Sequence, residues 1–384
     1  MHIPVARVAV PIALAGALLL VGCTGPGPAP TQAPTVETPA DSPAIAAAKE
    51  LVAKYSALPA PKAVAPLATT PPEGVFIVYI GCPLPICSIV YDNMVEATDI
   101  LGWESREIVA DFTPEAAQAA FDSALQLNPD GIEYIATMPR EVLAEQLAKA
   151  QEAGIWVAAA GDATVTQADV GPGTQFSTVS GSEPEKTLVS QVQAAYVIDA
   201  AVSNGDSLDD IAYIYDPAPS AYAVAYKVFA EEIEKAGGSV LPIEVNQAGA
   251  GTTIPGEVVS FLQTHPNVKY LGIAHDSFLT GIPDAITAAG LALPGIVGVD
   301  PAEENFEMIR DGRQLGSVMN DNRMVQWDFM DAFARESVGT PESEFKRLPE
   351  AGIMLVTPQN VEDAYGIRGG FPGVPDSYIK AWGK

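Results

Sequence analysis

The feature that most constrains the fold is an uninterrupted apolar segment, Val75–Ile80, that ends abruptly at a glycine. Its side chains are β-branched or aromatic and do not alternate with polar residues, which is typical of a strand buried on both faces of a parallel sheet. Pro83 and Pro85 then prevent further ladder pairing. Ligands of open α/β sheets bind outside the carboxyl ends of the strands. We therefore expect the loop after this strand to line a binding site, beginning with Cys82, Pro83 and Leu84.

The same unit of apolar strand followed by amphipathic helix recurs along the chain. The later strand-like segments are 107–110, 132–136, 155–160, 211–215, 240–245, 268–274, 296–299, 315–319 and 353–356. Alternation of strands with helices of this length predicts right-handed crossovers and parallel sheets. Because 384 residues exceed one typical core, we expect two α/β domains of the same build.

The amino-terminal region predicts export. Residues 1–22 have the features of a signal peptide, because a basic start at Arg7 precedes a short apolar run. Leu20-Val21-Gly22-Cys23 is similar to the bacterial lipobox, so we expect Cys23 to carry lipid and to anchor the protein to a membrane surface. Residues 23–73 are rich in Pro with one helix-forming stretch, and they predict a tether with a short helix ahead of a folded body that begins near Gly74.

Cys82 and Cys87 are the two cysteines that remain. In an oxidising compartment an even pair favours a disulfide, here across a short proline-kinked loop, although a reactive dithiol is an alternative. A metal site would need further His or Cys ligands, and none of the three histidines has a recognised ligand spacing to this loop. We therefore expect a disulfide, and neither a metal nor a cofactor.

The charge and the motifs argue against several classes of function. With 20 basic and 48 acidic residues the chain has a formal net charge of −28, which repels nucleic acid and anionic surfaces. The sequence contains no G-x-S-x-G, no H-E-x-x-H and no complete phosphate loop. We therefore expect no catalytic residues and no nucleic-acid partner.

Polar residues directly follow several of the predicted strands. Asp162, Asp276 and Asp300 each come after an apolar strand, and Asn320 comes after another. Any one of them could be only a turn or cap residue, but their recurrence at the carboxyl ends of strands indicates a shared cleft. Carboxylates and amides in fixed positions bind the hydroxyl groups of a small polyol. Arg323 is the only basic residue adjoining these strand ends, which argues against an anionic ligand.

The whole arrangement resembles a type I periplasmic binding protein, the solute receptor of an ABC importer. The motifs that carry the resemblance are Asn128-Pro129-Asp130-Gly131-Ile132, Ala153-Gly154-Ile155-Trp156-Val157, Thr264-His265-Pro266-Asn267-Val268 and Gly298-Val299-Asp300. They are spaced as in the sugar-binding branch, and the match covers about residues 74–360. The resemblance implies two three-layer α/β lobes with parallel sheets, joined by a hinge with three chain crossings, near 176–182, 319–322 and 348–352.

The resemblance also implies how the chain is divided and what it does. The expected parts are an N-terminal lobe of residues 74–178 and 322–348, a C-terminal lobe of residues 179–321 and 349–366, and a tail of residues 367–384. It further implies a monomeric, non-catalytic receptor that is lipid-anchored at the extracytoplasmic face of the cell membrane. Such a receptor captures a sugar or polyol between its lobes and delivers it to the ABC permease subunits and their ATPase.

By the same resemblance, the ligand contacts correspond to Asp162, Asp276, Asp300, Asn320 and the loop after the first strand. Sugar receptors commonly stack an aromatic ring on the ligand, and this loop has none. The candidates to supply a ring from elsewhere are Tyr222, Phe278, Phe306 and Trp327. Three alternatives stay open: a sensing receptor of the same fold coupled to a membrane signalling protein, an importer receptor for a non-sugar solute such as a nucleoside, and an extracytoplasmic α/β enzyme.

Overall fold

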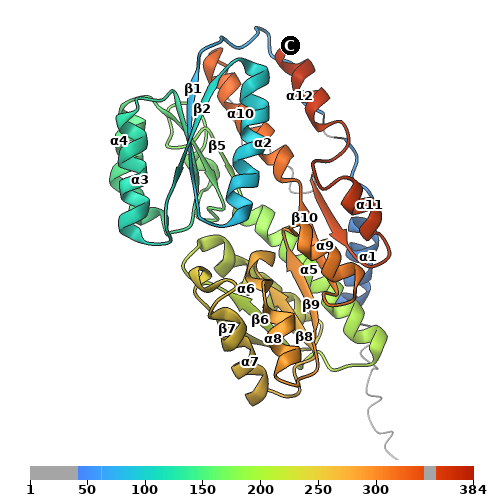
Figure 1. Ribbon diagram of the computed structural model, residues 1–384. Coiled ribbons are helices and arrows are strands. Elements are labelled where there is room, and N and C mark those ends of the chain that lie inside the picture. The colour runs from blue at the N-terminus through green and yellow to red at the C-terminus, as the bar shows by residue number, and fades with distance from the viewer. Residues whose placement is uncertain (1–41, 62, 341–351) are drawn as a thin grey trace, which may run out of the picture. The chain divides into compact units, whose positions relative to one another are not determined.

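The computed structural model describes residues 42–61, 63–340 and 352–384 (Figure 1). The predicted signal peptide, the predicted lipid attachment at Cys23 and part of the third predicted crossing, residues 348–351, lie outside these ranges. No helix within the described ranges is both long and apolar enough to cross a bilayer.

The first sheet has five strands, all parallel, in the order β2-β1-β3-β4-β5. They are β1 (Phe76–Gly81), β2 (Glu104–Val109), β3 (Gly131–Ile135), β4 (Trp156–Ala160) and β5 (Thr178–Ser180). Ile77 and Tyr79 of β1 belong to the core on one face of the sheet, and Val78 and Ile80 belong to the core on the other. The prediction that this apolar segment is a strand buried on both faces is therefore confirmed.

Helices cover both faces of this sheet, and together they form what we call the N-lobe. α2 (Pro85–Leu101) and α10 (Asn322–Ser337) pack against each other on one face, whereas α3 (Pro114–Gln126), η2 (Arg140–Leu143) and α4 (Ala144–Glu152) cover the other (Figure 1). Local sequence sets the helix ends. Thr113 caps α3 through its side chain, and Gly102 ends α2 in the left-handed conformation that glycine adopts without strain.

The second sheet has six strands in the order β11-β10-β9-β8-β6-β7, of which only β11 is antiparallel to its neighbour. They are β6 (Ile211–Tyr215), β7 (Val240–Glu244), β8 (Tyr270–Ile273), β9 (Gly295–Val299), β10 (Gly316–Asn320) and β11 (Ile353–Val356). The helices around it are α5 (Glu183–Asn204), α6 (Ser220–Lys235), α7 (Ile254–Thr264), α8 (Ile282–Ala288), α9 (Glu303–Arg310) and α11 (Val361–Gly366). We call this sheet and its helices the C-lobe. Both sheets confirm the predicted α/β class.

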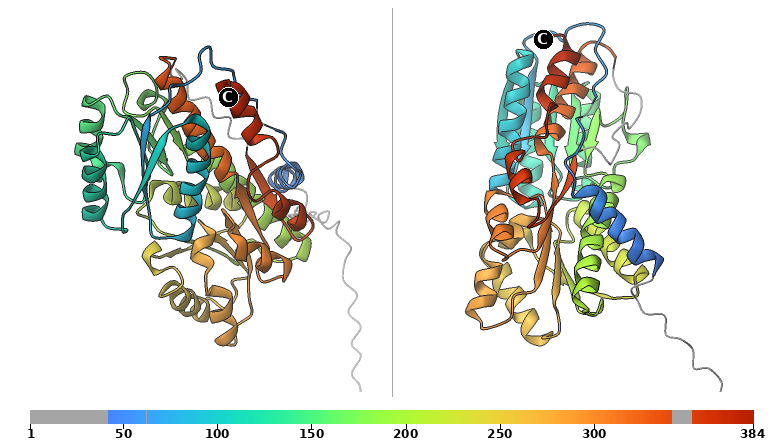
Figure 2. Two further views of the ribbon diagram at one scale, coloured as in Figure 1. Left: turned by 45° about the horizontal axis from the view of Figure 1, so that its top comes forward. Right: turned by 90° about the vertical axis from the view of Figure 1, so that its right-hand side faces the viewer.

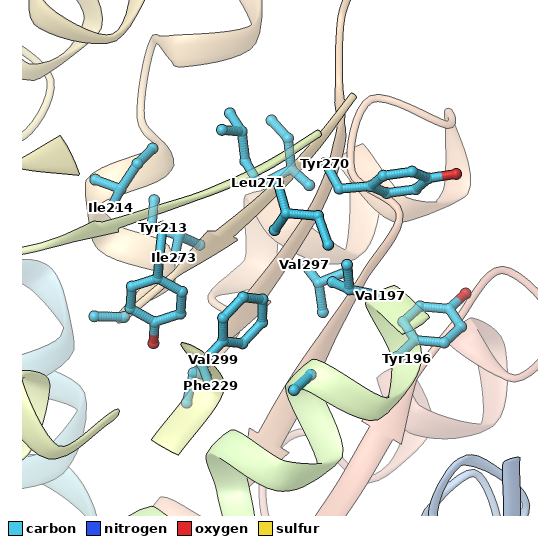
Figure 3. Packing of buried hydrophobic residues seen from close by; sticks show 14 of the residues in the cluster. Tyr196, Val197, Tyr213, Ile214, Phe229, Tyr270, Leu271, Ile273, Val297 and Val299 are labelled. Atoms are coloured by element: carbon cyan, nitrogen blue, oxygen red, sulfur yellow. The ribbon is translucent and has the colours of Figure 1, made fainter. Parts of the chain in front are cut away.

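The C-lobe core forms between the sheet and the helices that cross it (Figure 3). Tyr213 of β6 and Phe229 of α6 lie with their ring centroids 4.7 Å apart. Gly272 of β8 gives them room, because a Cβ atom at that position would come within 2.4 Å of the Tyr213 ring. The glycine therefore allows two aromatic rings to pack directly on the sheet.

The short helix expected in the tether is α1 (Pro43–Tyr55), and it packs on α5 of the C-lobe (Figure 2). Its side chains at positions 45, 48 and 55 are buried in the C-lobe core, because helical spacing places them on one face. We expected the folded body to begin near Gly74, and the structure instead begins its packed core at Ile45. The Pro-rich segment thus holds a helix that belongs to the core.

The carboxyl-terminal segment forms a further helix, α12 (Val374–Trp382), which packs on α10 of the N-lobe (Figure 2). Trp382 and Trp327 of α10 are stacked with ring centroids 5.3 Å apart, and both are almost completely buried. The Trp382 indole N–H donates to Asp331 Oδ1 at 2.8 Å. What we expected to be a tail is therefore part of the N-lobe core.

The chain passes between the lobes at the first two predicted crossings, from β5 into α5 and from β10 into α10. The third, from α10 to β11, includes residues outside the described ranges. Two further segments also connect the lobes: residues 56–75 lead from α1 to β1, and residues 367–373 lead from α11 to α12. The first of these segments is tied to α12, because the Leu67 N–H donates to the Ala381 carbonyl at 2.8 Å.

Candidate functional site

A cavity of about 200 Å³ lies where the carboxyl ends of strands from both sheets face each other. The N-lobe contributes the ends of β1, β3, β4 and β5 with the first turns of α2 and α10, and the C-lobe contributes the starts of α5 and α6 with the ends of β9 and β10. This is the position at which open α/β sheets bind ligands. The predicted site residues that line the cavity are Cys82, Leu84, Tyr222, Asp300 and Asn320.

The polar centre of the cavity is built on Asp300. Asp300 follows β9 with a φ of 61°, and its Oδ1 accepts a hydrogen bond of 2.7 Å from Asn320 Nδ2 at the end of β10. His275, which follows β8, places its Nε2 at 3.8 Å from Asp300 Oδ2. Three adjacent strand ends thus bring one carboxylate, one amide and one imidazole together. His275 was not among the predicted ligand contacts, although it directly precedes one of them.

The protonation of His275 follows from its surroundings. The Ser277 N–H donates to His275 Nδ1 at 3.1 Å, so Nδ1 is an acceptor and the proton of the neutral ring lies on Nε2, on the side of Asp300. Burial lowers the pKa of His275; the Asp300 carboxylate opposes this shift and Lys186 adds to it. The neutral imidazole therefore presents an N–H donor beside a carboxylate acceptor.

Tyr222 on α6 places an aromatic ring at the cavity, whereas the loop after β1 has none. It lines the cavity and packs edge-on against Phe278, with ring centroids 5.5 Å apart. Burial, and then the charges of Asp300 and Asp216, raise the pKa of its hydroxyl, which keeps the hydroxyl protonated and able to donate. The other aromatic candidates, Phe278, Phe306 and Trp327, are buried in the core and do not line the cavity.

Three predicted contacts lie elsewhere, and Asp276 is the clearest case. It is fully buried beneath β9, where its carboxylate accepts hydrogen bonds from Gln314 Nε2 at 2.9 Å and Ser317 Oγ at 2.6 Å. Gly298 makes the space, because a Cβ there would come within 1.6 Å of Asp276 Oδ1. Burial raises the pKa of Asp276 to about 8. Asp276 therefore stabilises the C-lobe interior, and the structure does not bring it to the cavity.

Asp162 and Pro83 are also outside the cavity lining. Asp162 is buried, and its Oδ1 accepts hydrogen bonds from the Thr164 N–H at 2.9 Å and the Thr164 hydroxyl at 2.6 Å. The hydroxyl of Ser220, at the start of α6, donates to the same oxygen at 3.4 Å. Asp162 thus shapes the turn after β4 and contacts the opposite lobe. Pro83 is exposed.

Lys186 is a lining residue that the strand-end pattern did not identify. It lies in the first turns of α5, beyond the capping box of Ser182 and Glu185, and no ion-pair partner is found for it among the described residues. Arg323, the cation that we expected nearest to the site, instead forms an ion pair with Glu96, with Nε at 2.6 Å from Oε2. The capping box in the sequence marks the start of the helix that follows β5. Because that helix starts beside the cavity, the capping box is the sequence signal that could have indicated Lys186.

The loop after β1 is closed by a disulfide between Cys82 and Cys87, whose Cα atoms are 5.5 Å apart. Both cysteines line the cavity. The predicted disulfide is therefore present, and it joins the end of β1 to the first turn of α2. Within the described ranges no group of His, Cys, Asp and Glu side chains is arranged to hold a metal ion.

No protein-family model and no curated protein sequence matches the chain. Solved structures do match it. An ABC transporter solute-binding protein from Agrobacterium vitis bound with α-D-tagatopyranose has a TM-score of 0.64 at 16% identity, covering 77% of this chain and 99% of its own. A Mycobacterium smegmatis protein in complex with β-D-fucofuranose has a TM-score of 0.63 at 17% identity, covering 81% and 98%.

A periplasmic ribose ABC transporter protein from Conexibacter woesei has a TM-score of 0.61 at 15% identity, covering 78% of this chain and 96% of its own. These similarities extend over both lobes and over nearly the full length of each solved chain. At such low identity they establish the arrangement of the chain and not its ligand. The chain has the fold of the type I periplasmic binding proteins.

Proposed function

We propose that this protein is the solute-binding lipoprotein of an ABC importer. It captures a small sugar or polyol between its lobes and delivers it to the permease subunits, without catalysing a reaction. The observation that carries the proposal is the cluster of Asp300, Asn320 and His275, which faces a cavity bounded by both lobes. The solved structures of the same fold that bind tagatopyranose, fucofuranose or allitol support the ligand class.

The chemistry of the polar centre suits neighbouring hydroxyl groups. The Asp300 carboxylate accepts hydrogen bonds, and the Nε2–H of neutral His275 and the ammonium of Lys186 donate them. A hydroxyl can do both, so two vicinal hydroxyls can bridge acceptor and donor. Charge-assisted hydrogen bonds of this kind contribute roughly 1.5–3 kcal/mol each.

Contacts between the lobes at the rim support enclosure of the ligand. The Ala163 N–H donates to Ser220 Oγ at 3.1 Å, and Gln247 Nε2 donates to the Thr137 carbonyl at 3.3 Å. Each of these bonds joins a loop of the N-lobe to the C-lobe. These bonds hold the two lobes together beside the cavity, and exclusion of solvent by the lobes would strengthen the polar contacts of a ligand.

The predicted anchor completes the proposal. A lipid on Cys23 would hold the protein at the extracytoplasmic face of the membrane, beside the permease. The Pro-rich residues that follow Cys23 have the composition of a flexible tether. We propose that the receptor acts there as a monomer.

A thermal-shift screen of the purified protein against sugars, polyols, nucleosides and amino acids tests the ligand class. Ligand binding stabilises the folded state by mass action, so we expect at least one sugar or polyol to raise the melting temperature. The matched variant Asp300→Asn should lose most of that shift. A shift with nucleosides or amino acids, and none with any sugar or polyol, would overturn the assignment of the ligand class.

A further inference from the structure

The walls of the cavity differ sharply in polarity. The C-lobe side carries the hydrogen-bonding side chains of Asp300, His275, Asn320, Lys186 and Gln247. The opposite side is formed by the loop after β1, the start of α2, the loop after β2 and the end of β3. We call this side the apolar wall, and its principal side chains are Leu84, Ile86, Val90, Phe112 and Ile135.

The apolar wall offers few side chains that can form hydrogen bonds with a ligand. Among the described lining residues from position 82 to position 181 there is no charged side chain, and Thr137 and Ser180 are the only ones with a hydroxyl or amide. The polar lining residues of the N-lobe outside this stretch, Asn322, Gln326 and Asp328, come from α10. A hydroxyl directed at the five apolar side chains loses its hydration and gains no side-chain partner.

From this asymmetry, and resting on the proposed function, we propose that the ligand is an amphiphilic polyol, a sugar with a hydrocarbon group at one end. Its vicinal hydroxyls contact Asp300, His275 and Lys186, and a methyl or methylene group contacts the apolar wall. Deoxy sugars and O-alkyl sugars have this chemistry. The cavity volume of about 200 Å³ restricts the ligand to a compact molecule.

The size of the expected preference follows from the behaviour of apolar pockets. One methyl or methylene group in such a pocket changes specificity by about 10–200-fold. We therefore expect a terminal deoxy sugar to bind about tenfold or more tightly than the sugar that carries a hydroxyl at the same carbon. Because the preference for the deoxy sugar comes from contact with the apolar wall, a mutation in the wall should reduce it.

Isothermal titration calorimetry of the full-length protein with matched pairs tests this. The pairs are D-galactose with D-fucose, D-glucose with 6-deoxy-D-glucose, and D-mannose with D-rhamnose. In every pair that binds, we expect the deoxy member to bind more tightly. Equal or tighter binding of the hydroxylated member overturns the amphiphilic ligand and leaves the sugar receptor standing. Binding of no member of any pair overturns the amphiphilic sugar, whereas the thermal-shift screen against sugars and polyols decides independently whether the protein is a sugar or polyol receptor.

A variant in the apolar wall tests whether the wall causes the preference for the deoxy sugar. Val90→Thr replaces a buried methyl of the apolar wall with a hydroxyl at nearly constant volume, and it should reduce the deoxy preference several-fold. Val95→Thr, on the same helix but outside the cavity lining, is the matched control and should leave the preference unchanged. A preference that survives in Val90→Thr, or that falls equally in both variants, contradicts recognition by the wall.

Discussion

Asp300 adopts a backbone conformation that few side chains tolerate, with φ at 61°. Asp and Asn enter this left-handed region more readily than other non-glycine residues. The conformation turns the chain at the end of β9 and places the carboxylate against Asn320. Asp300 thus sets both the backbone turn after β9 and the negative charge in the cavity. A variant that tests the charge must therefore keep a side chain of the same size that tolerates positive φ.

We expect Asp300→Asn to weaken sugar or polyol binding by about tenfold, because a charge-assisted hydrogen bond becomes a neutral one. Asparagine retains an oxygen acceptor and the tolerance of positive φ, so the melting temperature of the ligand-free protein should change little. Titration calorimetry measures the affinity, with Asp111→Asn on the exposed surface as the control. Unchanged affinity would remove Asp300 from the site.

Lys186→Met tests whether the Lys186 ammonium donates to the ligand. Lys186 lies in a helix, so the search for polar residues after strands did not find it. The long apolar side chain preserves the helix but removes the ammonium from the cavity, so affinity should fall several-fold while unfolding is unaffected. Lys227→Met on the exposed part of α6 serves as the control. Equal affinities of the two variants would show that Lys186 makes no ligand contact.

The buried carboxyl of Asp276 predicts a pH dependence of stability. Its folded-state pKa is raised from 3.8 to about 8, so between these values the folded protein keeps a proton that the unfolded chain releases. The free energy of unfolding therefore falls as pH rises through this window, by up to about 1.4 kcal/mol per pH unit. Urea unfolding of Asp276→Asn across the window should show a shallower slope than wild type. Exposed Asp99→Asn should retain the wild-type slope.

At the scale of secondary-structure elements, a variant in α12 tests whether this carboxyl-terminal helix stabilises the N-lobe. Trp382 stacks on Trp327 and donates to Asp331, so Trp382→Ala removes a large buried ring and a hydrogen bond. We expect a loss of about 3–5 kcal/mol of unfolding free energy, measured by denaturant titration. Lys380→Ala, exposed on the same helix, should cost much less. A small loss in Trp382→Ala would mean that α12 is dispensable for the N-lobe.

Most elements were predictable because their signals are local. The apolar run ending at Gly81 predicts β1, and the capping box at Ser182 predicts the start of α5, and both agree with the structure. The packing of α1 and α12 could not be predicted, because periodicity shows that a helix has a buried face and does not show which partner covers it. The Pro-rich composition on both sides of α1 favoured a tether, and it does not show that α1 itself packs on the C-lobe.

The site was predictable in part for a related physical reason. Side chains that continue the strand direction, Asp300 and Asn320, reach the cavity as the strand-end rule predicts. At Asp276 the chain enters a 3₁₀ turn, η5 (Asp276–Leu279), and the side chain fills the space that Gly298 leaves beneath β9. Lys186 comes from a helix start, which that rule does not consider. The sequence thus indicates where a site lies more reliably than which side chains face it.

At the scale of the whole molecule, the anchor can be tested without a ligand. Cys23→Ser removes the thiol to which the lipid would be attached, so the protein should remain unprocessed or be released from the membrane. Fractionation of cells into membrane and soluble material, with immunoblotting, measures the outcome. Cys82→Ser, which leaves the anchor in place, is the control. Membrane retention of processed Cys23→Ser would contradict the lipid anchor.

The position of α12 has a consequence for how this protein is made. The N-lobe sheet is complete by residue 180, yet the helices that cover one of its faces include α10 and, packed on it, α12. A polypeptide is synthesised from its amino terminus. The strands β1 to β5 are therefore made before α10 and α12, which carry Trp327 and Trp382. The first sheet to be synthesised is therefore the last to receive all the helices that cover it.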